Sequence, residues 1–332
     1  MKVDEISCCQ IQEWYPHFKS LSFKTLIHEL PQSFVSYLLE DSGPFLLPVS
    51  ISGDDALPNR VPNVDNEHES LIPDEDSESS TVQPSFPELE SEIRSSIMAL
   101  GGAVFPKLNW SSPKDAAWIS TTGTLKCTSF SEIALLLHSS DSIVHDLCHA
   151  FDSCDGPDSP DQPEKFFLAL RKWYPSLHPE MEFRCFVRDQ ILIGVSQREV
   201  TGFYPILLER KSEIDTNIEA FFRENVRLKF KSENYVCDVY VMKDGRVKII
   251  DFGPYGAFTL PLLFTWEELE ENYMSKRREL RIVENQCGVR PGLKTAVPYD
   301  YLDMSAGSGW DQVLKRADEE LQRQGKSTEA GA

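Results

Sequence analysis

The segment that most constrains the fold runs from Asn234 to Tyr255, NYVCDVYVMKDGRVKIIDFGPY. It contains two apolar runs, rich in β-branched and aromatic residues, separated by Asp244-Gly245. An Asp-Gly pair between such runs predicts a β-hairpin, because a type I′ turn needs positive φ at both central residues. With this pair as the loop, we expect three cross-strand pairs: Lys243 with Arg246, Val241 with Lys248, and Asp238 with Asp251.

The predicted pairing of Asp238 with Asp251 places two like charges on one face of the sheet. Directly opposed residues have Cβ atoms about 4.5–5.5 Å apart, so the two carboxylates repel each other unless something compensates. A divalent cation is one compensation, since Mg²⁺ takes carboxylate oxygens and usually substrate phosphates. The alternative is a solvated pair at a strand end, in a hairpin shifted by a bulge. The residues alone leave both interpretations open.

Composition limits the class of protein. The 332 residues suffice for one large or two small domains with a sizeable core. A net charge of −20 argues against direct binding to nucleic acid or to an anionic membrane, and it fits a partner with a basic patch. No apolar run reaches the roughly 20 residues that span a bilayer. With no signal peptide and no CxxC pair among eight cysteines, we expect a cytoplasmic protein with reduced thiols.

A zinc site is a weaker alternative near residue 150. His145, Cys148, His149 and Cys154 lie close together in the sequence and border a loop rich in Asp, Ser and Pro. Their spacing matches no usual zinc site, so we do not favour this interpretation.

Residues 52–84 form an acidic segment, with nine Asp or Glu residues against one Arg. Such a segment cannot bury enough apolar surface to offset its chain entropy, so we expect it to be disordered. The alternative is an acidic switch, phosphorylated at Ser77, Ser79 or Ser80.

Several other elements follow from local patterns. Apolar residues at helical spacing predict a helix over 89–100 that Gly101-Gly102 ends, and Thr265 with Glu268 predicts a capping box at the start of another helix. Asp189-Gln190 predicts a second hairpin, with Arg184 opposite Val195 and Glu182 opposite Gln197. Further predictions are strands over 103–108 and 166–173, helices over 131–137, 213–225 and 310–321, and an extended stretch over 292–309.

These elements suggest an α+β fold of the ATP-grasp type. Two lobes of mostly antiparallel sheet with helices would hold a triphosphate between them, with Lys, Arg and the paired carboxylates around it. The sequence contains no Gly-rich P-loop and no GxGxxG, so other common nucleotide-binding folds are not supported.

Seven segments carry a resemblance to a known family: CQIQEWYPHFKS, LGGAVFPKLNWSSPKDAAWIS, LALRKWYPSL, MEFRCFV, YVCDVYV, RVKIIDF and LLFTWEEL. The chain resembles the cell division cycle protein 123 family over nearly its whole length. Its sequence resembles the plant branch of that family. The resemblance implies an ATP-grasp fold that binds ATP and Mg²⁺. It also implies an assembly chaperone, rather than an enzyme, for eukaryotic translation initiation factor 2. Such a protein binds the gamma subunit, promotes its joining to the alpha subunit and supports cell-cycle entry. We expect a monomer with no direct contact to nucleic acid or membrane.

The resemblance also implies roles for individual residues. Cations from both lobes meet the phosphates, one segment meets the adenine, and two carboxylates bind the metal. The resemblance implies that Lys107 binds phosphate and that Asn109 and Trp110 line the same entry. It implies that the adenine is met by Arg171, Lys172 and Trp173. It further implies that Arg184 contacts phosphate and that Mg²⁺ is bound by Asp238 and Asp251.

One position departs from the family pattern. The family has Asp-Phe-Asn after the second metal carboxylate, whereas this chain has Asp251-Phe252-Gly253. Position 253 returns to the face of Asp251, where an amide oxygen would complete the metal shell. Water is a ready replacement, because Mg²⁺ retains waters.

The expected organisation has five parts. An N-terminal segment (1–51) packs on the core, and the acidic loop (52–84) follows. The first ATP-grasp lobe spans 85–164, and the second, with the metal hairpin, spans 165–275. A C-terminal extension (276–332) is the candidate partner-binding segment. Two alternatives remain for function: an ATP-grasp ligase that activates a carboxylate, and an interaction protein with a degenerate nucleotide site.

Overall fold

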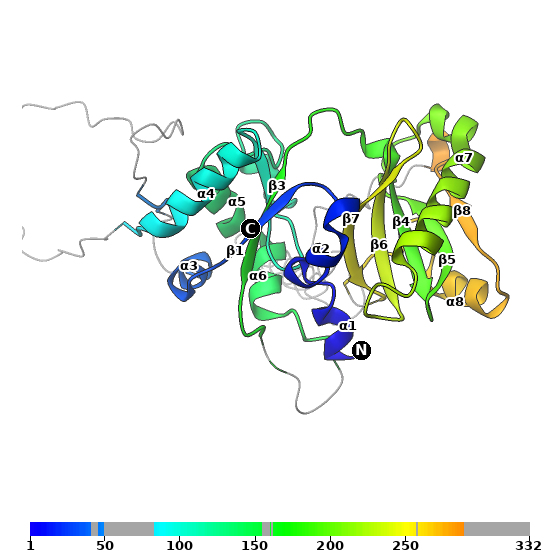
Figure 1. Ribbon diagram of the computed structural model, residues 1–332, viewed down its shortest axis with the longest axis horizontal. Coiled ribbons are helices and arrows are strands. Elements are labelled where there is room, and N and C mark those ends of the chain that lie inside the picture. The colour runs from blue at the N-terminus through cyan, green and yellow to red at the C-terminus, as the bar shows by residue number, and fades with distance from the viewer. Residues whose placement is uncertain (41–45, 50–82, 155–159, 161, 257, 289–332) are drawn as a thin grey trace, which may run out of the picture. The chain divides into compact units, whose positions relative to one another are not determined.

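The computed structural model describes residues 1–40, 46–49, 83–154, 160, 162–256 and 258–288. The chain divides into two compact units (Figure 1). Unit 1 contains the described residues of Met1–Cys9, Ser153–Asp155 and Leu177–Ala332, and unit 2 those of Gln10–Asp152 and Gly156–Ser176. Each unit has its own sheet and is described by itself below.

Unit 2 is built on a three-stranded antiparallel sheet of order β1-β3-β2. The strands are β1 (Thr25–Glu29), β2 (Val104–Lys107) and β3 (Phe167–Lys172). The helices are α2 (Ile11–Phe18), α3 (Gln32–Leu38), α4 (Pro87–Ala99), α5 (Phe130–His138) and α6 (Asp141–Cys148), with short 3₁₀ turns at η1 (Lys19–Leu21) and η2 (Ala117–Ile119).

The ends of the helices in unit 2 follow from their sequence. α4 ends where Gly101 and Gly102 take φ values of 98° and 86°, which side chains disfavour. The Gly102 N–H then donates to the Ile97 carbonyl at 2.8 Å. α5 begins at Ser129, whose side chain and that of Glu132 cap each other's backbone N–H groups. Both predicted helices are confirmed, as is the strand that delivers Lys107.

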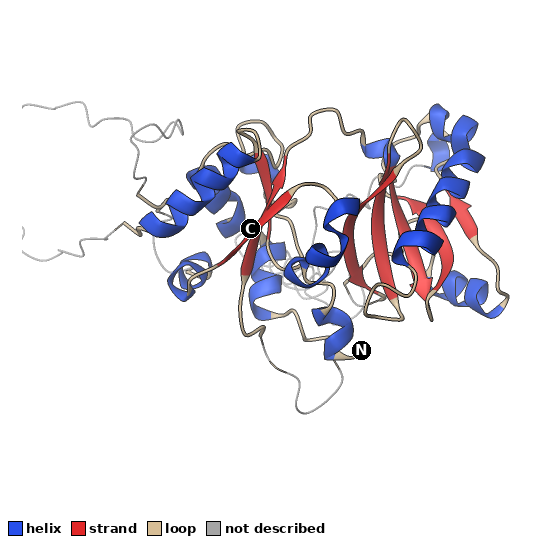
Figure 2. Ribbon diagram, viewed as in Figure 1, coloured by secondary structure: helices blue, strands red, loops and turns tan. Residues whose placement is uncertain are grey.

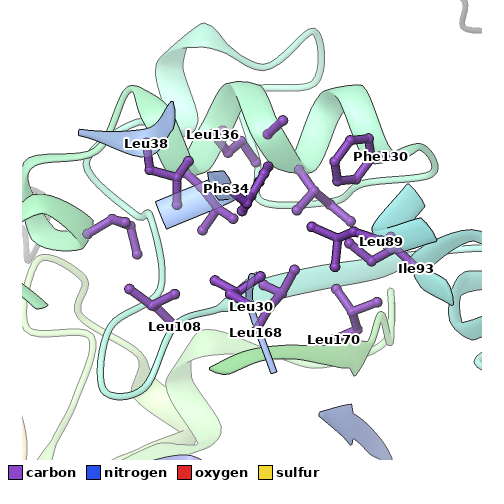
Figure 3. Packing of buried hydrophobic residues seen from close by; sticks show 14 of the residues in the cluster. Leu30, Phe34, Leu38, Leu89, Ile93, Leu108, Phe130, Leu136, Leu168 and Leu170 are labelled. Atoms are coloured by element: carbon purple, nitrogen blue, oxygen red, sulfur yellow. The ribbon is translucent and has the colours of Figure 1, made fainter. Parts of the chain in front are cut away.

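The core of unit 2 lies between these helices and one face of the sheet. Figure 3 shows Phe34 of α3, Ile93 of α4 and Phe130 of α5 facing Leu168 and Leu170 of β3. These side chains are at most 4% exposed. Each buried aliphatic or aromatic side chain of this size contributes about 1.5–3 kcal/mol, so the cluster holds the strands that carry the site residues.

Unit 1 is built on a five-stranded sheet of order β7-β6-β4-β5-β8 (Figure 2). The strands are β4 (Glu182–Arg188), β5 (Ile191–Gln197), β6 (Tyr235–Val241), β7 (Val247–Pro254) and β8 (Glu279–Arg281), and only β5 and β8 pair in parallel. The helices are α1 (Val3–Ser7), α7 (Pro205–Phe221) and α8 (Trp266–Met274). A π-helical turn, η4 (Phe222–Val226), continues α7, and η3 (Pro179–Met181) and η5 (Gln286–Gly288) are 3₁₀ turns.

Two predictions for the helices of unit 1 have different outcomes. The predicted capping box of Thr265 and Glu268 begins α8, as expected. The helix predicted over 213–225 begins eight residues earlier, with Pro205 in its first turn. Its first turns contain exposed Ile206 and Leu208, so apolar periodicity understates its length, whereas Pro is favoured at a helix start.

The boundary between the units differs from the sequence-based one. β3 pairs with β1 and β2, so residues up to Ser176 belong to unit 2 rather than to a lobe that begins at 165. Most of the N-terminal segment also belongs to unit 2, because β1 is an edge strand of its sheet. The acidic segment from 52 to 82, the extended stretch over 292–309 and the helix over 310–321 lie outside the described residues. Within the described part, we find no helix whose length and apolar character would let it span a bilayer.

The hairpin of β4 and β5 turns at Asp189-Gln190, as predicted. Both residues have positive φ, 48° and 60°, which a two-residue type I′ loop requires. A bulge then shifts the register by one residue, so Arg184 lies opposite Ser196 and not Val195, and Phe183 rather than Glu182 lies opposite Gln197. The shift places Gly194 opposite Phe186, under α8. A Cβ at Gly194 would lie 2.8 Å from the Leu269 side chain, so this position needs a glycine.

The hairpin of β6 and β7 differs from the predicted two-residue turn. Gly245 alone has positive φ, 82°, and Met242 pairs with Arg246 around a three-residue loop. Val241 therefore lies opposite Val247, not Lys248, and the pair Lys243–Arg246 does not form. A bulge at the Asp238/Val239 step leaves Ile250 extra and restores the predicted pair of Asp238 with Asp251.

The hydrophobic pattern explains this bulge. The observed register places Ile249 opposite Val239 and Val247 opposite Val241, and all four side chains are buried. The uninterrupted register would instead place Lys248 opposite the fully buried Val241. A one-residue shift exchanges the two faces of a strand, so the buried face selects the register.

Candidate functional site

The sheet of unit 1 brings polar residues of three adjacent strands into one row. Arg184 of β4 lies opposite Asp238 of β6, and Asp238 lies opposite Asp251 of β7. Directly opposed residues point to the same face of a sheet. The structure therefore brings together three of the residues that the sequence singled out, all within unit 1.

Asp238 is held by two arginines. Arg184 donates to it twice, from Nε to Oδ1 at 2.8 Å and from Nη2 to Oδ2 at 2.9 Å, which is a bidentate pair. Arg198 donates from Nε to Oδ2 at 2.8 Å and from Nη1 to Glu182 at 3.0 Å. The remaining Arg184 nitrogen, Nη1, donates to the Leu260 carbonyl at 2.9 Å. Asp238 is 5% exposed, so these bonds form almost without solvent.

The charges of this cluster nearly balance. Burial would raise the pKa of Asp238, but Arg184 and Arg198 outweigh it and hold that pKa below its usual range. Burial would likewise lower the pKa of Arg198, but Asp238, Glu182 and the nearby Asp251 raise it instead. Asp238 and Arg198 are therefore both charged at neutral pH. Three carboxylates face two guanidinium groups, and one negative charge is left in excess.

The donor set fits a hard cation in part. Oδ2 of Asp238 accepts two hydrogen bonds, whereas Oδ1 accepts one from Arg184 and keeps a lone-pair direction. Asp251 adds a second carboxylate on the same face. Among the described residues, no three His, Cys, Asp or Glu side chains are arranged to hold a metal. The two aspartates therefore suit Mg²⁺ only with phosphate or water as further ligands.

Gly253 lies on this face as well. It is opposite Val236, two residues from Asp238 along β6, as expected from the period of two. A Cβ at this position would meet the hydroxyl of Thr259 at 3.4 Å and no other atom of the described residues within 4 Å, its chain neighbours aside. Among the described residues the position therefore has room for a Cβ, so crowding there does not account for the glycine.

The phosphate-binding candidate Lys107 lies in unit 2, at the end of β2. Its side chain is 2% exposed, and its ammonium group donates to the Trp110 carbonyl. Asn109 is completely buried. It donates to Gln10 at 2.6 Å and to the Lys165 carbonyl at 3.2 Å, and it accepts from the Phe167 N–H at 2.7 Å. These contacts give Asn109 a structural role, tying β2 to β3; contact with a nucleotide stays a prediction.

Asp146 of α6 anchors the turn after β2, and the sequence did not single it out. It accepts from the backbone N–H groups of Trp110 at 3.1 Å and Ser111 at 2.7 Å, and from the Ser111 hydroxyl at 2.8 Å. Burial raises the pKa of Asp146, while Ser111, Lys107 and Trp110 oppose that effect. The Trp110 ring packs edge-on against Phe151 with centroids 5.8 Å apart. No signal in the local sequence reveals Asp146, because it acts across 35 residues.

The segment expected to meet adenine lies at the end of β3, also in unit 2. Arg171 is 1% exposed, donates to the Ser22 hydroxyl at 3.2 Å and lies over the rings of Phe23 and Phe105. Lys172 lies over the Tyr174 ring, and Trp173 packs edge-on against Phe105. Arg171 is thus enclosed by its own unit. Lys172 and Trp173, which are partly exposed, remain the better candidates for contact with a ligand.

Arg198 is the other functional candidate that the sequence reasoning missed. It follows β5 by one residue, on the same face as Ser196 and hence as Arg184. The predicted hairpin register hid this relationship, because it placed Val195 opposite Arg184. The zinc alternative gains no support, since the described residues contain no such cluster. That the thiols of the chain are reduced stays a prediction.

The chain is similar to known proteins over most of its length. A family model described as D123 matches residues 14–305. A Xenopus laevis protein named "Translation initiation factor eIF2 assembly protein" is 38% identical over 329 residues, covering 95% of this chain and 95% of that protein. A Schizosaccharomyces pombe protein of the same name is 37% identical over 337 residues, covering 95% and 98%.

A solved structure is similar over most of the chain. The structure described as "Structure of Cdc123 from Schizosaccharomyces pombe" matches with a TM-score of 0.67 and 35% sequence identity, covering 86% of this chain and 99% of that one. The two proteins share an α+β fold. With the family model spanning most of the chain and relatives similar over nearly their full length, the chain belongs to the D123 family.

Proposed function

We propose that this chain is an ATP- and Mg²⁺-binding assembly factor for eukaryotic translation initiation factor 2, and that it binds the gamma subunit. The observation that carries the proposal is similarity over 95% of the chain to proteins named as assembly proteins of that factor. Binding of a nucleotide is supported by the charged cluster of unit 1, which consists of Glu182, Arg184, Arg198, Asp238 and Asp251. It combines two carboxylates on one face with two guanidinium groups that suit phosphate.

In this proposal the two units are ATP-grasp lobes, and the residues of each have separate tasks. Asp251 and Oδ1 of Asp238 would hold Mg²⁺, which supplies positive charge to neutralise the polyphosphate when bound. Arg184 and Lys107 would bind phosphate oxygens, and Lys172 and Trp173 would meet the base. Asn109 and Asp146 would act indirectly, by fixing the strand and turn that carry Lys107.

Nucleotide would then serve as a structural ligand or switch for a binding protein, and the protein would act in the cytoplasm in support of cell-cycle progression. A ligase would need a separate polar pocket for an acceptor, and none of the residues identified here supplies one. The alternative of an interaction protein with a degenerate nucleotide site is supported by Arg184 and Arg198, because both already form ion pairs with Asp238, a proposed metal ligand. ATP binding distinguishes the degenerate site from the other two functions, and ATP-dependent ligation distinguishes the ligase from the assembly factor.

The test is a calorimetric titration with Mg-ATP, with and without the isolated gamma subunit, followed by a pull-down of the alpha subunit. We expect Mg-ATP to bind, the gamma subunit to bind, and alpha recruitment to increase when both are present. ATP-dependent joining of added amines to acids would favour the ligase. Gamma binding without any ATP binding would favour the degenerate site, and absence of gamma binding would refute the assembly role.

A further inference from the structure

Arg198 is fixed in place by the turn that follows β5. Its backbone N–H donates to the Glu182 carbonyl at 3.0 Å. The preceding residue, Gln197, is completely buried; it donates to the carbonyls of Glu199 at 2.5 Å and Gly202 at 2.9 Å, and it accepts from the Val283 N–H at 2.9 Å. The turn is therefore braced from within, and it aims the guanidinium group at the row of acidic residues.

The guanidinium group of Arg198 bridges two acidic residues of neighbouring strands. It binds Asp238 on β6 and Glu182 on β4, and its side chain is 18% exposed. Asp238 also binds Arg184, so its Oδ2 accepts from two guanidinium groups at once. An oxygen that accepts two hydrogen bonds has no lone pair left for a cation.

This arrangement makes the two aspartates a poor site for a free cation. The cluster has one negative charge in excess, but Asp238 and Glu182 are already paired with guanidinium groups. A Mg²⁺ ion that approaches Asp238 therefore also meets two guanidinium charges in a setting with little water, where charges interact strongly. A polyphosphate changes the balance, because it brings negative charge that the arginines attract and oxygens that complete the metal shell. Metal binding at this cluster therefore needs a bound polyphosphate.

We propose that Arg198 is a positioning residue that suppresses binding of free Mg²⁺ at Asp238 and Asp251, and thereby makes metal binding depend on a bound polyphosphate. The inference rests on the proposed function, in that it takes this cluster to be the metal–nucleotide site. It goes beyond it by assigning a task to a residue that contacts neither the metal nor the base. Removal of Arg198 should therefore increase the affinity for metal alone, a gain that loss of structure would not produce.

The experiment measures Mn²⁺ binding by electron paramagnetic resonance, with the full chain, in the absence and presence of ATP. Arg198→Gln is compared with the wild type and with Arg246→Gln, which removes an equal charge from an exposed ion pair at the tip of the hairpin that carries Asp238 and Asp251. In Arg198→Gln we expect Mn²⁺ alone to bind at least tenfold more tightly. The factor by which ATP tightens Mn²⁺ binding should fall at least tenfold. Arg246→Gln should behave as the wild type, and Arg198→Lys, which keeps the charge, should still bind Mn²⁺ alone weakly.

Equal or weaker binding of Mn²⁺ alone by Arg198→Gln would overturn the inference. Circular dichroism checks the fold, and Arg198→Met carries the same expectation if the Gln variant does not fold. If neither neutral variant folds, the wild type decides: Mn²⁺ binding that is equally tight with and without tripolyphosphate refutes the dependence, and binding only with tripolyphosphate supports it. A wild type that binds no Mn-ATP refutes the proposed nucleotide site, while the comparison with Mn²⁺ alone still decides the role of Arg198.

Discussion

Arg184 of β4 and Asp238 of β6 lie directly opposite each other in the sheet and form a bidentate ion pair, with N···O distances of 2.8 and 2.9 Å. The register thus does more than align two strands. It brings the planar guanidinium fork and the carboxylate into the one geometry in which both oxygens bind. Because Asp238 is 5% exposed, loss of either partner would leave a charge in a buried site without its counter-charge, which destabilises the fold.

Asp238→Asn should destabilise the protein by about 3–5 kcal/mol, because it leaves the partly buried Arg184 and Arg198 without a matching negative charge. Urea unfolding followed by circular dichroism measures the effect. Asp244→Asn is the matched control, since Asp244 pairs with Arg246 at an exposed hairpin tip, where solvent screens the interaction and the pair contributes little to stability. Equal effects of the two substitutions would contradict a special role for the buried pair.

The same pair predicts how stability depends on pH. Asp238 has a folded-state pKa that its arginines hold below the unfolded value of about 3.9. Its stabilising contribution is therefore complete above that value and is lost as the pH falls through the folded pKa. Urea unfolding in steps from pH 5 downward should show a steeper loss below about pH 4 in the wild type than in Asp238→Asn. Parallel curves would refute this assignment.

Asp251→Asn should weaken Mg-ATP binding at least tenfold, about 1.4 kcal/mol, because one of the two proposed metal carboxylates is lost. Without metal we expect little change in stability, within about 0.5 kcal/mol, since the arginines already offset the repulsion between the two aspartates. Calorimetry and urea unfolding test the two parts. Unchanged Mg-ATP affinity would show that Asp251 is not a ligand.

Gly253→Asn should tighten Mg-ATP binding, because it supplies the amide oxygen that the sequence resemblance leads us to expect at this position. The backbone should tolerate the change, because among the described residues, its chain neighbours aside, a Cβ meets the Thr259 hydroxyl alone, at 3.4 Å, and φ at Gly253 is not positive. Gly253→Ala controls for the effect of a Cβ alone. Equal affinities for the two variants would mean that water or another group already fills that part of the metal shell.

Removal of residues 290–332 should weaken binding of the gamma subunit and leave Mg-ATP binding intact. The segment lies outside the described residues, but its sequence offers apolar anchors, with aromatic residues at Tyr299, Tyr301 and Trp310. A pull-down and a calorimetric titration, after circular dichroism confirms folding, measure both activities. Full gamma affinity would place the interface on the two units. Loss of ATP binding as well would show that the segment is structural.

The sequence predicted more of the hairpin than of its surroundings. The predicted pairing of Asp238 with Asp251 is found, although a three-residue loop and a one-residue bulge, which offset each other in register, replace the regular ladder expected from alternation and the Asp-Gly pair. The turn type and the bulge at Ile250 were not predictable from that pair. They depend on which face of the strand is buried, and that is a property of the assembled sheet.

Residues that act over long sequence distances were the ones missed. Arg198 meets Asp238 across 40 residues, and Asp146 meets Ser111 across 35. Neither contact has a local pattern, since it exists only once strands or helices are side by side. The burial of individual site candidates could not be predicted from the sequence either. Asn109 and Arg171 were expected to contact a nucleotide, yet each is at most 1% exposed and hydrogen-bonded within its own unit.

The extra residue at Ile250 has a second consequence, for association between molecules. Among the strands that the structure describes, β7 is the last of its sheet, and a long regular edge is a template on which another chain can add a strand and aggregate. The bulge interrupts the regular backbone spacing midway along β7, and Pro254 removes a donor at its end. The bulge therefore also makes this strand a poorer template for another chain. A deletion of Ile250, which would make the ladder regular and keep Asp251 opposite Asp238, should lower solubility.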